Sequence, residues 1–342
     1  MGSRNSWSGL RKTPKGLDNP AQGNTLGRRL LFSLFPFATL SGSQSHFYCF
    51  DPRVARETRL PWAIIFHAYS VKQINLVATT TNTINEPLPR EMQQHTYAIM
   101  RRVEESHWWF VGRRLIIRSF LERLVRDLKT NRAAQGSSPN ILDVGCGTGA
   151  NLEMLSEFGA AEGVDVSAEA LSFCKARGLE KVKLGAAEAL PYDDNSFDLA
   201  TGLDVVEHLD DDLAGLKEMR RVLSCDGRAL LFVPAFMFLW GVQDDISNHR
   251  RRYTIKGLKR VVREAGFEVE RATYVNISFF APILLGRLFM RATGLRPESE
   301  NNITIGFLNG VLGKLLAAER GPLRYLNFPF GVSIICVARR IE

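Results

Sequence analysis

The chain has 342 residues and carries 44 Lys and Arg residues against 36 Asp and Glu residues, a formal net charge of +8. This length allows one large domain with a substantial extension. The excess of basic residues favours anionic partners, either lipid headgroups or nucleic acid. Because no nucleic-acid-binding motif is present, we do not expect nucleic acid. The five cysteines are scattered singly, without the spacing typical of a disulfide framework or a structural zinc site, and this favours a reducing, cytoplasmic compartment.

Residues 1–90 differ from the rest of the chain. Residues 1–24 are polar and lack helical or strand periodicity, which is typical of a disordered tail. Leu30–Leu40 is an apolar run behind two arginines, too short to span a bilayer as a helix but similar to the core of a signal peptide. Three interpretations remain open: a targeting peptide, a poorly ordered appendage, or a non-native extension upstream of a natural start at Met92.

Regular patterning begins at residue 91. Apolar residues from Ile117 to Leu128 follow the spacing of one helix face, so we expect residues 91–135 to form an N-terminal helical lid. Residues 136–342 then alternate strands with helices, which predicts an α/β fold with a doubly wound, seven-stranded, mainly parallel sheet. The strands are expected at Asn140–Val144, Ala161–Asp165, Lys181–Leu184, Phe197–Gly202, Arg228–Val233, Phe267–Val275 and Val332–Arg339.

Helices are expected between these strands, and several carry terminal signals. Ser167 and Thr254 are good N-caps, and Gly178 and Gly266 are good residues for ending the same two helices. A third helix face is expected to run from Leu209 to Leu223, and a further helix occupies Asn151–Phe158.

A glycine-rich loop follows the first of these strands. Gly145, Gly147 and Gly149 allow the backbone to turn sharply and to approach a ligand closely at the carboxyl ends of the strands. The GxGxG spacing differs from the GxGxxG of the dinucleotide fingerprint. Asp143 precedes the loop, and Asp165 ends the second strand, where a carboxylate can accept both ribose hydroxyls of a nucleoside. The pattern therefore predicts a nucleoside-containing ligand.

Several blocks at the expected intervals give the chain a clear resemblance to the class I S-adenosylmethionine-dependent methyltransferases. They are Ile141–Gly149, Gly163–Ser167, Glu188–Pro191 with Phe197–Asp198, and Leu203–His208. The resemblance implies a Rossmann-like fold and S-adenosyl-L-methionine as cofactor, with the glycine loop around the methionine, Asp165 at the ribose and Ala187–Glu188 beside the adenine. The cofactor-binding residues that it implies are Asp143, Gly145, Cys146, Gly147, Gly149, Asp165, Val166, Ala187, Glu188 and Leu203. Ala186 stands where the family often has an Asp, so the adenine contact falls to backbone groups or to Glu188.

Two histidines are candidates for the chemistry. A sulfonium methyl group is already activated, so the protein mainly aligns a nucleophile with it, and an oxygen nucleophile must also lose its proton. His208 follows the fourth strand and His249 follows the fifth, so either can be the base, and either can instead be a structural hydrogen-bonding residue.

The stretch around these histidines most resembles the ubiquinone-biosynthesis O-methyltransferases and their bacterial relatives. In that subgroup an acidic-x-x-Glu-His cluster is connected with a divalent metal, and the matching residues here are Asp204, Glu207 and His208. The alternative, an ordinary loop without a metal, is the one we adopt. Three consecutive arginines follow, Arg250, Arg251 and Arg252. They either bind a carboxylate or phosphate group of the substrate, or they are solvated charges on the surface.

Two flanking elements bear on the substrate. Arg113 or Arg114 could pair with the cofactor carboxylate, or both could be surface arginines. Residues 277–325 form an apolar insertion where this fold usually has a short hairpin, and we expect a helical cap over a greasy substrate, a membrane-interface element, or a core extension.

From these features we expect a methyltransferase that acts on an oxygen of a hydrophobic or lipid-linked small molecule. It would be cytoplasmic and could be peripheral at an anionic membrane surface. The alternatives are a small-molecule N- or C-methyltransferase and a catalytically silent S-adenosylmethionine-binding protein, since fold alone does not fix function.

Overall fold

The computed structural model describes residues 94–131, 138–295 and 308–341. The chain divides into two units, residues 1–82 and 83–342, and every described residue belongs to the second. The interpretations of residues 1–90 therefore concern residues outside the described ones, as does the part of the insertion at 296–307.

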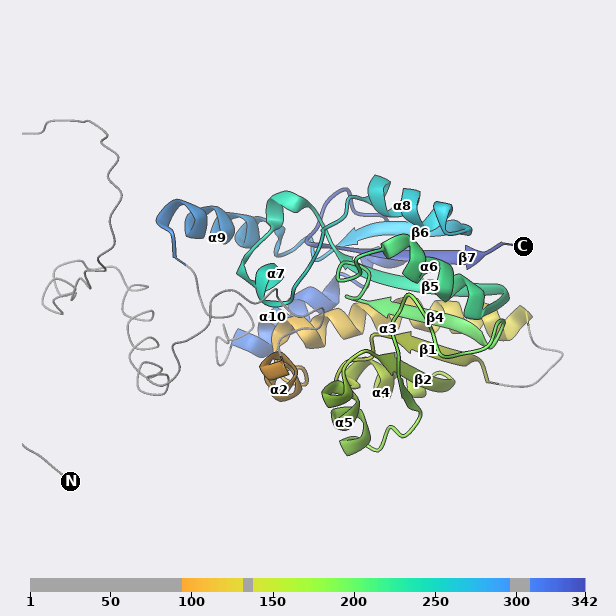
Figure 1. Ribbon diagram of the computed structural model, residues 1–342. Coiled ribbons are helices and arrows are strands. Elements are labelled where there is room, and N and C mark those ends of the chain that lie inside the picture. Colours follow the sequence, from red (N-terminus) through yellow and green to blue (C-terminus); the bar gives the residue numbers. More distant parts are fainter. Residues whose placement is uncertain (1–93, 132–137, 296–307, 342) are drawn as a thin grey trace, which may run out of the picture. The chain divides into compact units, whose positions relative to one another are not determined.

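A seven-stranded sheet forms the centre of this unit (Figure 1). Its strand order is β3-β2-β1-β4-β5-β7-β6, and all neighbours are parallel except that β7 runs antiparallel to both β5 and β6. The predicted doubly wound, mainly parallel sheet is confirmed. The strands are β1 (Asn140–Val144), β2 (Ala160–Asp165), β3 (Val182–Leu184), β4 (Phe197–Leu203), β5 (Leu223–Pro234), β6 (Phe267–Val275) and β7 (Ser333–Arg340).

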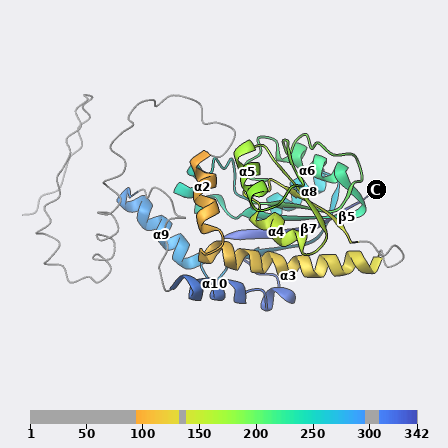
Figure 2. The same ribbon diagram turned by 90° about the horizontal axis from the view of Figure 1, so that it is seen from below.

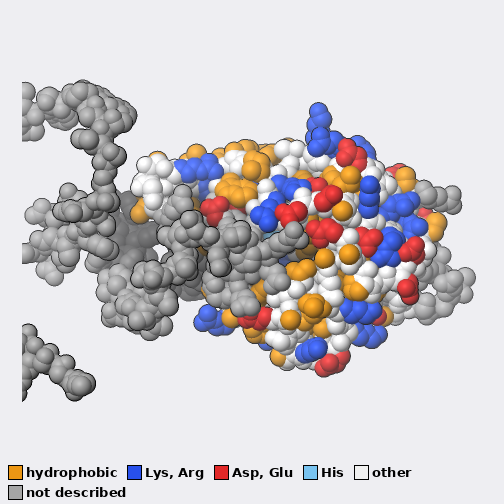
Figure 3. Space-filling model, in the orientation of Figure 1, with side chains coloured by type: hydrophobic (Ala, Val, Ile, Leu, Met, Phe, Trp, Pro, Cys, Tyr) orange, Lys and Arg blue, Asp and Glu red, His pale blue; other side chains and the backbone are white. Residues whose placement is uncertain are grey.

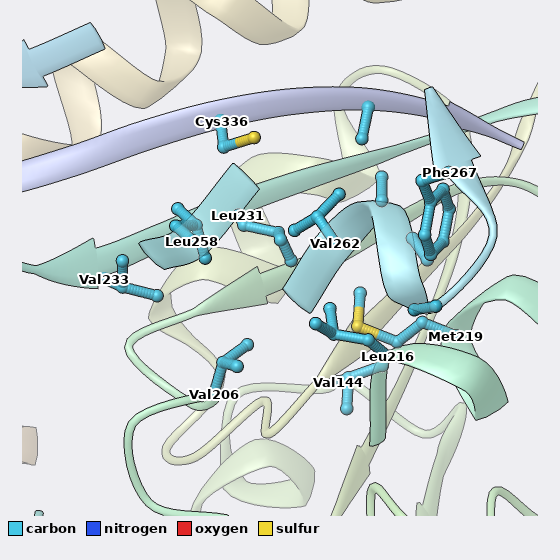
Figure 4. Close-up of a cluster of buried hydrophobic side chains, with 14 of the residues drawn as sticks. Val144, Val206, Leu216, Met219, Leu231, Val233, Leu258, Val262, Phe267 and Cys336 are labelled. Carbon is cyan, nitrogen blue, oxygen red and sulfur yellow. The ribbon is translucent and has the colours of Figure 1, made fainter. Parts of the chain in front are cut away.

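Helices cover both faces of the sheet because adjacent residues of a buried strand point to opposite sides. In β5, Leu231 belongs to the cluster that α6 and α8 cover (Figure 4), whereas Leu230 belongs to the cluster on the α3 and α10 side. The helices are α2 (Gln94–Val103), α3 (Trp108–Asn131), α4 (Ala150–Ser156), α5 (Ala168–Ala176), α6 (Asp212–Val222), α7 (Val242–Ile246), α8 (Ile255–Glu264), α9 (Phe280–Thr293) and α10 (Leu308–Ala318).

The predicted N-caps of α5 and α8 are confirmed. The Ser167 and Thr254 side chains accept hydrogen bonds from the backbone N–H groups of Ala170 and Gly257. The expected helix face from Leu209 to Leu223 is too long, because α6 stops at Val222 and Leu223 begins β5. Leu209 and Leu223 lie outside the helix but pack in the same apolar cluster as its buried face. The helical spacing of apolar residues in the sequence therefore extends beyond the ends of α6.

The segment predicted to be a lid and the described part of the insertion each divide into a part that packs on the core and a part near the strand ends. The apolar row of α3 packs on the sheet, and α10 lies alongside α3 (Figure 2), so both helices extend the core. By contrast, α2 and α9 lie beyond the carboxyl ends of the parallel strands (Figure 1). Among the described residues, no helix is long and apolar enough to cross a membrane.

Candidate active site

A cavity of about 980 Å³ lies at the carboxyl ends of the parallel strands. One end is formed by the glycine loop and the residues after β2, and the other by the segment after β5 together with α9. Residues of α2 and the start of α3 complete the wall, including Trp108 and Trp109. Ligand sites usually have volumes of roughly 300–1,000 Å³, and this cavity lies at the upper end of that range. It is continuous and can accept a nucleoside cofactor with an acceptor beside it.

The glycine loop turns between β1 and α4 in a backbone conformation that suits glycine. Gly145 and Gly147 have φ angles of 68° and 54°, a region that residues with side chains rarely adopt. A Cβ atom on Gly145 would also collide with the side chain of Val205. Gly147 has open space at that position, so a ligand can approach its backbone closely.

Asp165 links the end of β2 to this loop. Its carboxylate accepts hydrogen bonds from Gly147 N at 2.8 Å and from Ser167 N at 2.9 Å. A carboxylate oxygen can accept more than one hydrogen bond, so this group suits ribose hydroxyls. The predicted cofactor residues that line the cavity are Gly145, Cys146, Gly147, Asp165, Val166, Ala187, Glu188 and Leu203.

Asp143 and Gly149 are the two predicted cofactor residues that are not among those lining the cavity. The carboxyl group of Asp143 is buried in the sheet, where Thr201 Oγ1 donates a hydrogen bond to it at 2.6 Å. Burial raises the pKa of Asp143 to about 7. Gly149, with a φ angle of 88°, forms the start of α4. Both residues shape the loop from behind rather than facing the cavity.

Glu104, at the end of α2, is a cavity residue to which the sequence reasoning gave no role. Its buried carboxylate accepts hydrogen bonds from Thr148 Oγ1 of the glycine loop and from Arg177 after α5. Arg177 also donates to the Thr148 carbonyl at 2.9 Å. Because the partners of Glu104 lie 44 and 73 residues further along the chain, no local sequence pattern could have revealed this contact.

Arg113 and Arg114 lie side by side in the sequence but in different surroundings. Arg113 is buried, forms an ion pair with Asp204 at 2.6 Å and lies over the ring of Phe232 at 4.7 Å. Arg114 also lines the cavity, and its side chain makes no hydrogen bond or ion pair with a described residue. Of the two predicted candidates, Arg114 is therefore the one available to a cofactor carboxylate.

His208 and His249 face each other at the opposite end of the cavity. Their rings are perpendicular, with centroids 4.6 Å apart. Nδ1 of His249 lies 2.8 Å from Oδ1 of Asp244, a fully buried carboxylate. Burial alone would raise the pKa of Asp244, but the hydrogen bond with His249 and the charge of Arg252 lower it to about 2.

His208 has no such carboxylate partner. Burial, followed by the neighbouring His249, lowers the pKa of His208 to about 3, so this imidazole stays neutral over the physiological range. A group with so low a pKa is a weak proton acceptor. The sequence named both histidines as candidate bases, but Asp244 was not recognised as a partner of His249.

Glu207 lies behind the two histidines and is fully buried. Neither of its carboxylate oxygens has a hydrogen-bond partner among the described residues, and burial together with Asp204 raises its pKa well above the usual value. Ligand atoms of Glu207, His208 and His249 lie within 4.8 Å of one another, a donor set that suits a divalent transition metal. This group differs from the one that the resemblance pointed to, Asp204, Glu207 and His208, because Arg113 holds Asp204 in an ion pair.

The three predicted arginines after β5 diverge. Arg251 binds Asp212 at 2.9 Å and does not line the cavity. Arg250 lines it and pairs with Asp210 at 3.0 Å. The side chain of Arg252 is 5% exposed and donates to Asp244 at 2.7 Å. Arg287 of α9, not recognised from the sequence, reaches the same carboxylate at 3.5 Å.

Comparisons with known proteins bear on the cofactor end of this cavity. Residues 142–231 match the methyltransferase domain family. The chain is 36% identical over 119 residues to an uncharacterized methyltransferase of Bacillus subtilis, covering 33% of this chain and 47% of that protein. It is 26% identical over 197 residues to ajmaline N-methyltransferase of Rauvolfia serpentina, covering 53% and 65%. It is also 36% identical over 119 residues to a ubiquinone/menaquinone biosynthesis C-methyltransferase of Geotalea uraniireducens, covering 30% and 48%. The chain thus spans between about half and two thirds of the length of these relatives.

Proposed function

Because the chain contains a class I S-adenosylmethionine-dependent methyltransferase domain, we propose that the whole protein methylates an oxygen atom of a hydrophobic or lipid-linked small molecule. The observation that carries this proposal is the continuity of the cavity. The glycine loop and Asp165 line one end of it, and the Asp244–His249 pair lines the other. A base close to the cofactor is what methyl transfer to a hydroxyl requires.

The cofactor end holds its ligand through a few groups. Asp165 accepts the ribose hydroxyls, Gly147 brings the backbone close to the methionine portion, and Arg114 meets its carboxylate. When bound, the cofactor supplies a methyl group activated by its sulfonium centre. Trp108 and Trp109 line the cavity wall and help to exclude water from the reacting atoms.

The acceptor end prepares the nucleophile. The Nδ1–H group of His249 donates a hydrogen bond to Asp244, which fixes the tautomer and leaves Nε2 as the proton acceptor. In this arrangement His249 Nε2 accepts the proton of the acceptor hydroxyl, and a bound cofactor would supply the methyl group to that oxygen and leave as the neutral thioether. Asp244 stays ionised, because its pKa is about 2, and stabilises the imidazolium that forms.

Methyl transfer to nitrogen or carbon is the alternative within the same reaction class, and two relatives carry those descriptions. A matched test uses S-adenosylmethionine with an isotope-labelled methyl group and three acceptors that share one alkyl chain: a catechol, an aniline and a quinol. The NMR shift of the transferred methyl group identifies the acceptor atom. We expect an O-methyl product from the catechol, and labelled N-methyl or C-methyl products alone would contradict the proposal. Cofactor binding without transfer would instead indicate a silent binding protein.

The lipid-linked part of the proposal draws on α9. Ile283, Gly286 and Met290 line the cavity, whereas Leu285, Leu288 and Phe289 are exposed on the other side of the helix. Acidic and basic side chains intermingle over the uncovered part of the face in Figure 3. We therefore attribute an attraction to membranes to this apolar row, which would bring the cavity to an acceptor in a bilayer.

A further inference from the structure

A buried carboxylate joins α2 to the glycine loop. Glu104, which directly follows α2, is 3% exposed and lines the cofactor end of the cavity. It accepts hydrogen bonds from Thr148 Oγ1 of the loop and from Nη2 of Arg177, the residue that follows α5. We call these three residues the Glu104 cluster. Because a buried carboxylate is costly unless it is paired in this way, the cluster stabilises α2 in its position against the loop.

Arg177 connects the cluster to the loop backbone a second time. Its Nε donates to the carbonyl of Thr148 at 2.9 Å, and its side chain is 5% exposed. It also pairs with Glu105 at 3.0 Å and with Glu153 of α4 at 2.8 Å. Arg177 is not among the residues that line the cavity, so its guanidinium acts on a bound cofactor only through its neighbours.

The position of α2 decides how far the cofactor end of the cavity is covered. Tyr97 and Met100 of α2 line the cavity together with Glu104, and α2 lies beside α5 and runs crosswise to α3 (Figure 2). Thr148 directly follows Gly147, whose backbone a ligand can approach closely. The contact that holds α2 therefore also holds the loop at the point nearest to the cofactor.

We propose that Glu104 is a positioning residue that holds α2 over bound S-adenosylmethionine, and that the cofactor enters and leaves when Glu104 separates from Arg177 and Thr148. This inference rests on the proposed placement of the cofactor and is independent of the acceptor atom. Weakening the cluster would let α2 move away while the sheet stays folded, so entry and exit of the cofactor would both become faster. Loss of a group that only binds the cofactor would speed its exit alone.

The test measures the association and dissociation rate constants of S-adenosylhomocysteine with the full chain by stopped-flow fluorescence. We expect Glu104→Gln to raise the dissociation rate constant by about tenfold or more, as for lost charge-assisted hydrogen bonds, and to raise the association rate constant as well. Arg177→Gln should do the same, although Arg177 does not line the cavity. In hydrogen exchange without ligand, the amides of α2 should exchange faster in both variants, and those of α8 should not.

Glu105→Gln is the matched control, because Glu105 also pairs with Arg177 but is 57% exposed and does not line the cavity. It should leave both rate constants unchanged, as expected for an exposed ion pair. An association rate constant that Glu104→Gln fails to raise overturns the inference, as does an Arg177→Gln variant with the rate constants of the unmodified protein. If one of these two variants does not fold, the other decides. If the unmodified protein does not bind S-adenosylhomocysteine, the proposed function fails and this inference fails with it.

Discussion

The carboxylate of Asp244 lies 2.8 Å from Nδ1 of His249, five residues further along the chain. Both residues belong to the segment that leaves β5, and α7 (Val242–Ile246) holds Asp244 in its first turn. The aspartate is fully buried, whereas the histidine remains partly exposed toward the cavity. A buried, ionised partner behind an accessible imidazole is the arrangement that makes a histidine an effective general base.

The first prediction separates the two histidines. His249→Gln should lower kcat by about 10²–10⁴-fold, the usual contribution of a general base. His208→Gln should lower it far less, because an imidazole with a pKa of about 3 is already a weak base. Steady-state kinetics with the preferred acceptor measure both. A larger loss for His208→Gln would reverse the assignment.

The control for this comparison is the binding of S-adenosylhomocysteine, which both variants should retain.

Chelation supplies a second check, because a metal held by Glu207, His208 and His249 would occupy the same histidine. We expect turnover by the unmodified protein to survive EDTA, since Asp244 already engages His249 and the raised pKa of Glu207 favours its neutral form. Loss of turnover that added Zn²⁺ or Mn²⁺ restores would favour the metal.

The second prediction concerns the ribose contact. Asp165→Ala should weaken S-adenosylmethionine binding by about 1.5–3 kcal/mol, which is about 10–100-fold in Kd. The loss combines the ribose hydrogen bonds with the support that Asp165 gives to Gly147 N. Calorimetric titration measures it, with Asp193→Ala, an exposed acidic residue outside the cavity, as the control. Unchanged affinity in the folded Asp165 variant would remove the ribose assignment.

Features defined by local sequence could be predicted well. Ser167 and Gly178 mark the ends of α5 because capping is decided within a few residues, and β6 has the predicted bounds, Phe267–Val275. The glycine loop and Asp165 could be placed at one sheet edge because parallel strands end together. These are the parts of the cofactor end that short-range patterns specify.

Features that depend on distant contacts could not be predicted in this way. Glu104 reaches the glycine loop only after α2 folds back over it, and Arg287 meets Asp244 across 43 residues. The charge of Arg287 lies in an apolar stretch that otherwise resembles a core or membrane helix. Its contact with Asp244 becomes visible only when α9 is placed beside the segment that follows β5.

The third prediction distinguishes two neighbouring arginines. Arg114→Ala should raise the Kd for S-adenosylmethionine by about 10–100-fold, because a charge-assisted contact with the cofactor carboxylate is lost. Arg118→Ala, one turn later on α3 and paired with Glu157 at 2.6 Å, should leave the Kd unchanged. Arg113→Ala should instead lower stability, by up to about 3–5 kcal/mol, because Asp204 loses its partner. Equal Kd values for Arg114→Ala and the unmodified protein would refute the carboxylate contact.

The fourth prediction concerns the pH dependence of stability. The folded pKa of Asp143 is about 7, above the ordinary value of 3.8, so its protonated form stabilises the fold at low pH and this contribution is lost as the pH rises through about 7. Asp143→Asn cannot ionise, and its amide oxygen can still accept from Thr201. The variant should therefore be more stable than the unmodified protein at pH 8, by about 1–4 kcal/mol.

Denaturant unfolding at pH 5 and pH 8 tests this difference, and the two proteins should be closer in stability at pH 5. Cofactor affinity should change little, because Asp143 does not line the cavity. A variant that is less stable at pH 8, or one that loses cofactor binding, would show that the ionised carboxylate matters directly.

The fifth prediction concerns the exposed row of α9. Leu285 is 65% exposed, Leu288 48% and Phe289 52%, and residues three and four apart share one helix face. Burying this row in an interface would contribute about 25 cal/mol per Å², and Arg291 would add about 1 kcal/mol near anionic lipid. The full chain should therefore sediment with vesicles that contain anionic lipid, more weakly at high salt. Changing all three residues to Ser should abolish sedimentation, because the apolar contribution is then lost.

The matched control changes Val311 and Leu315 to Ser. These residues of α10 are 59% and 50% exposed, but their helix packs against α3 away from the cavity. This variant should sediment like the unmodified protein, which separates a specific docking face from general surface hydrophobicity. Equal loss in both variants would show that apolar exposure alone is responsible. Absence of sedimentation at low salt would exclude a membrane role for α9, while the Arg287 contact at its inner face would still position it as a wall of the cavity.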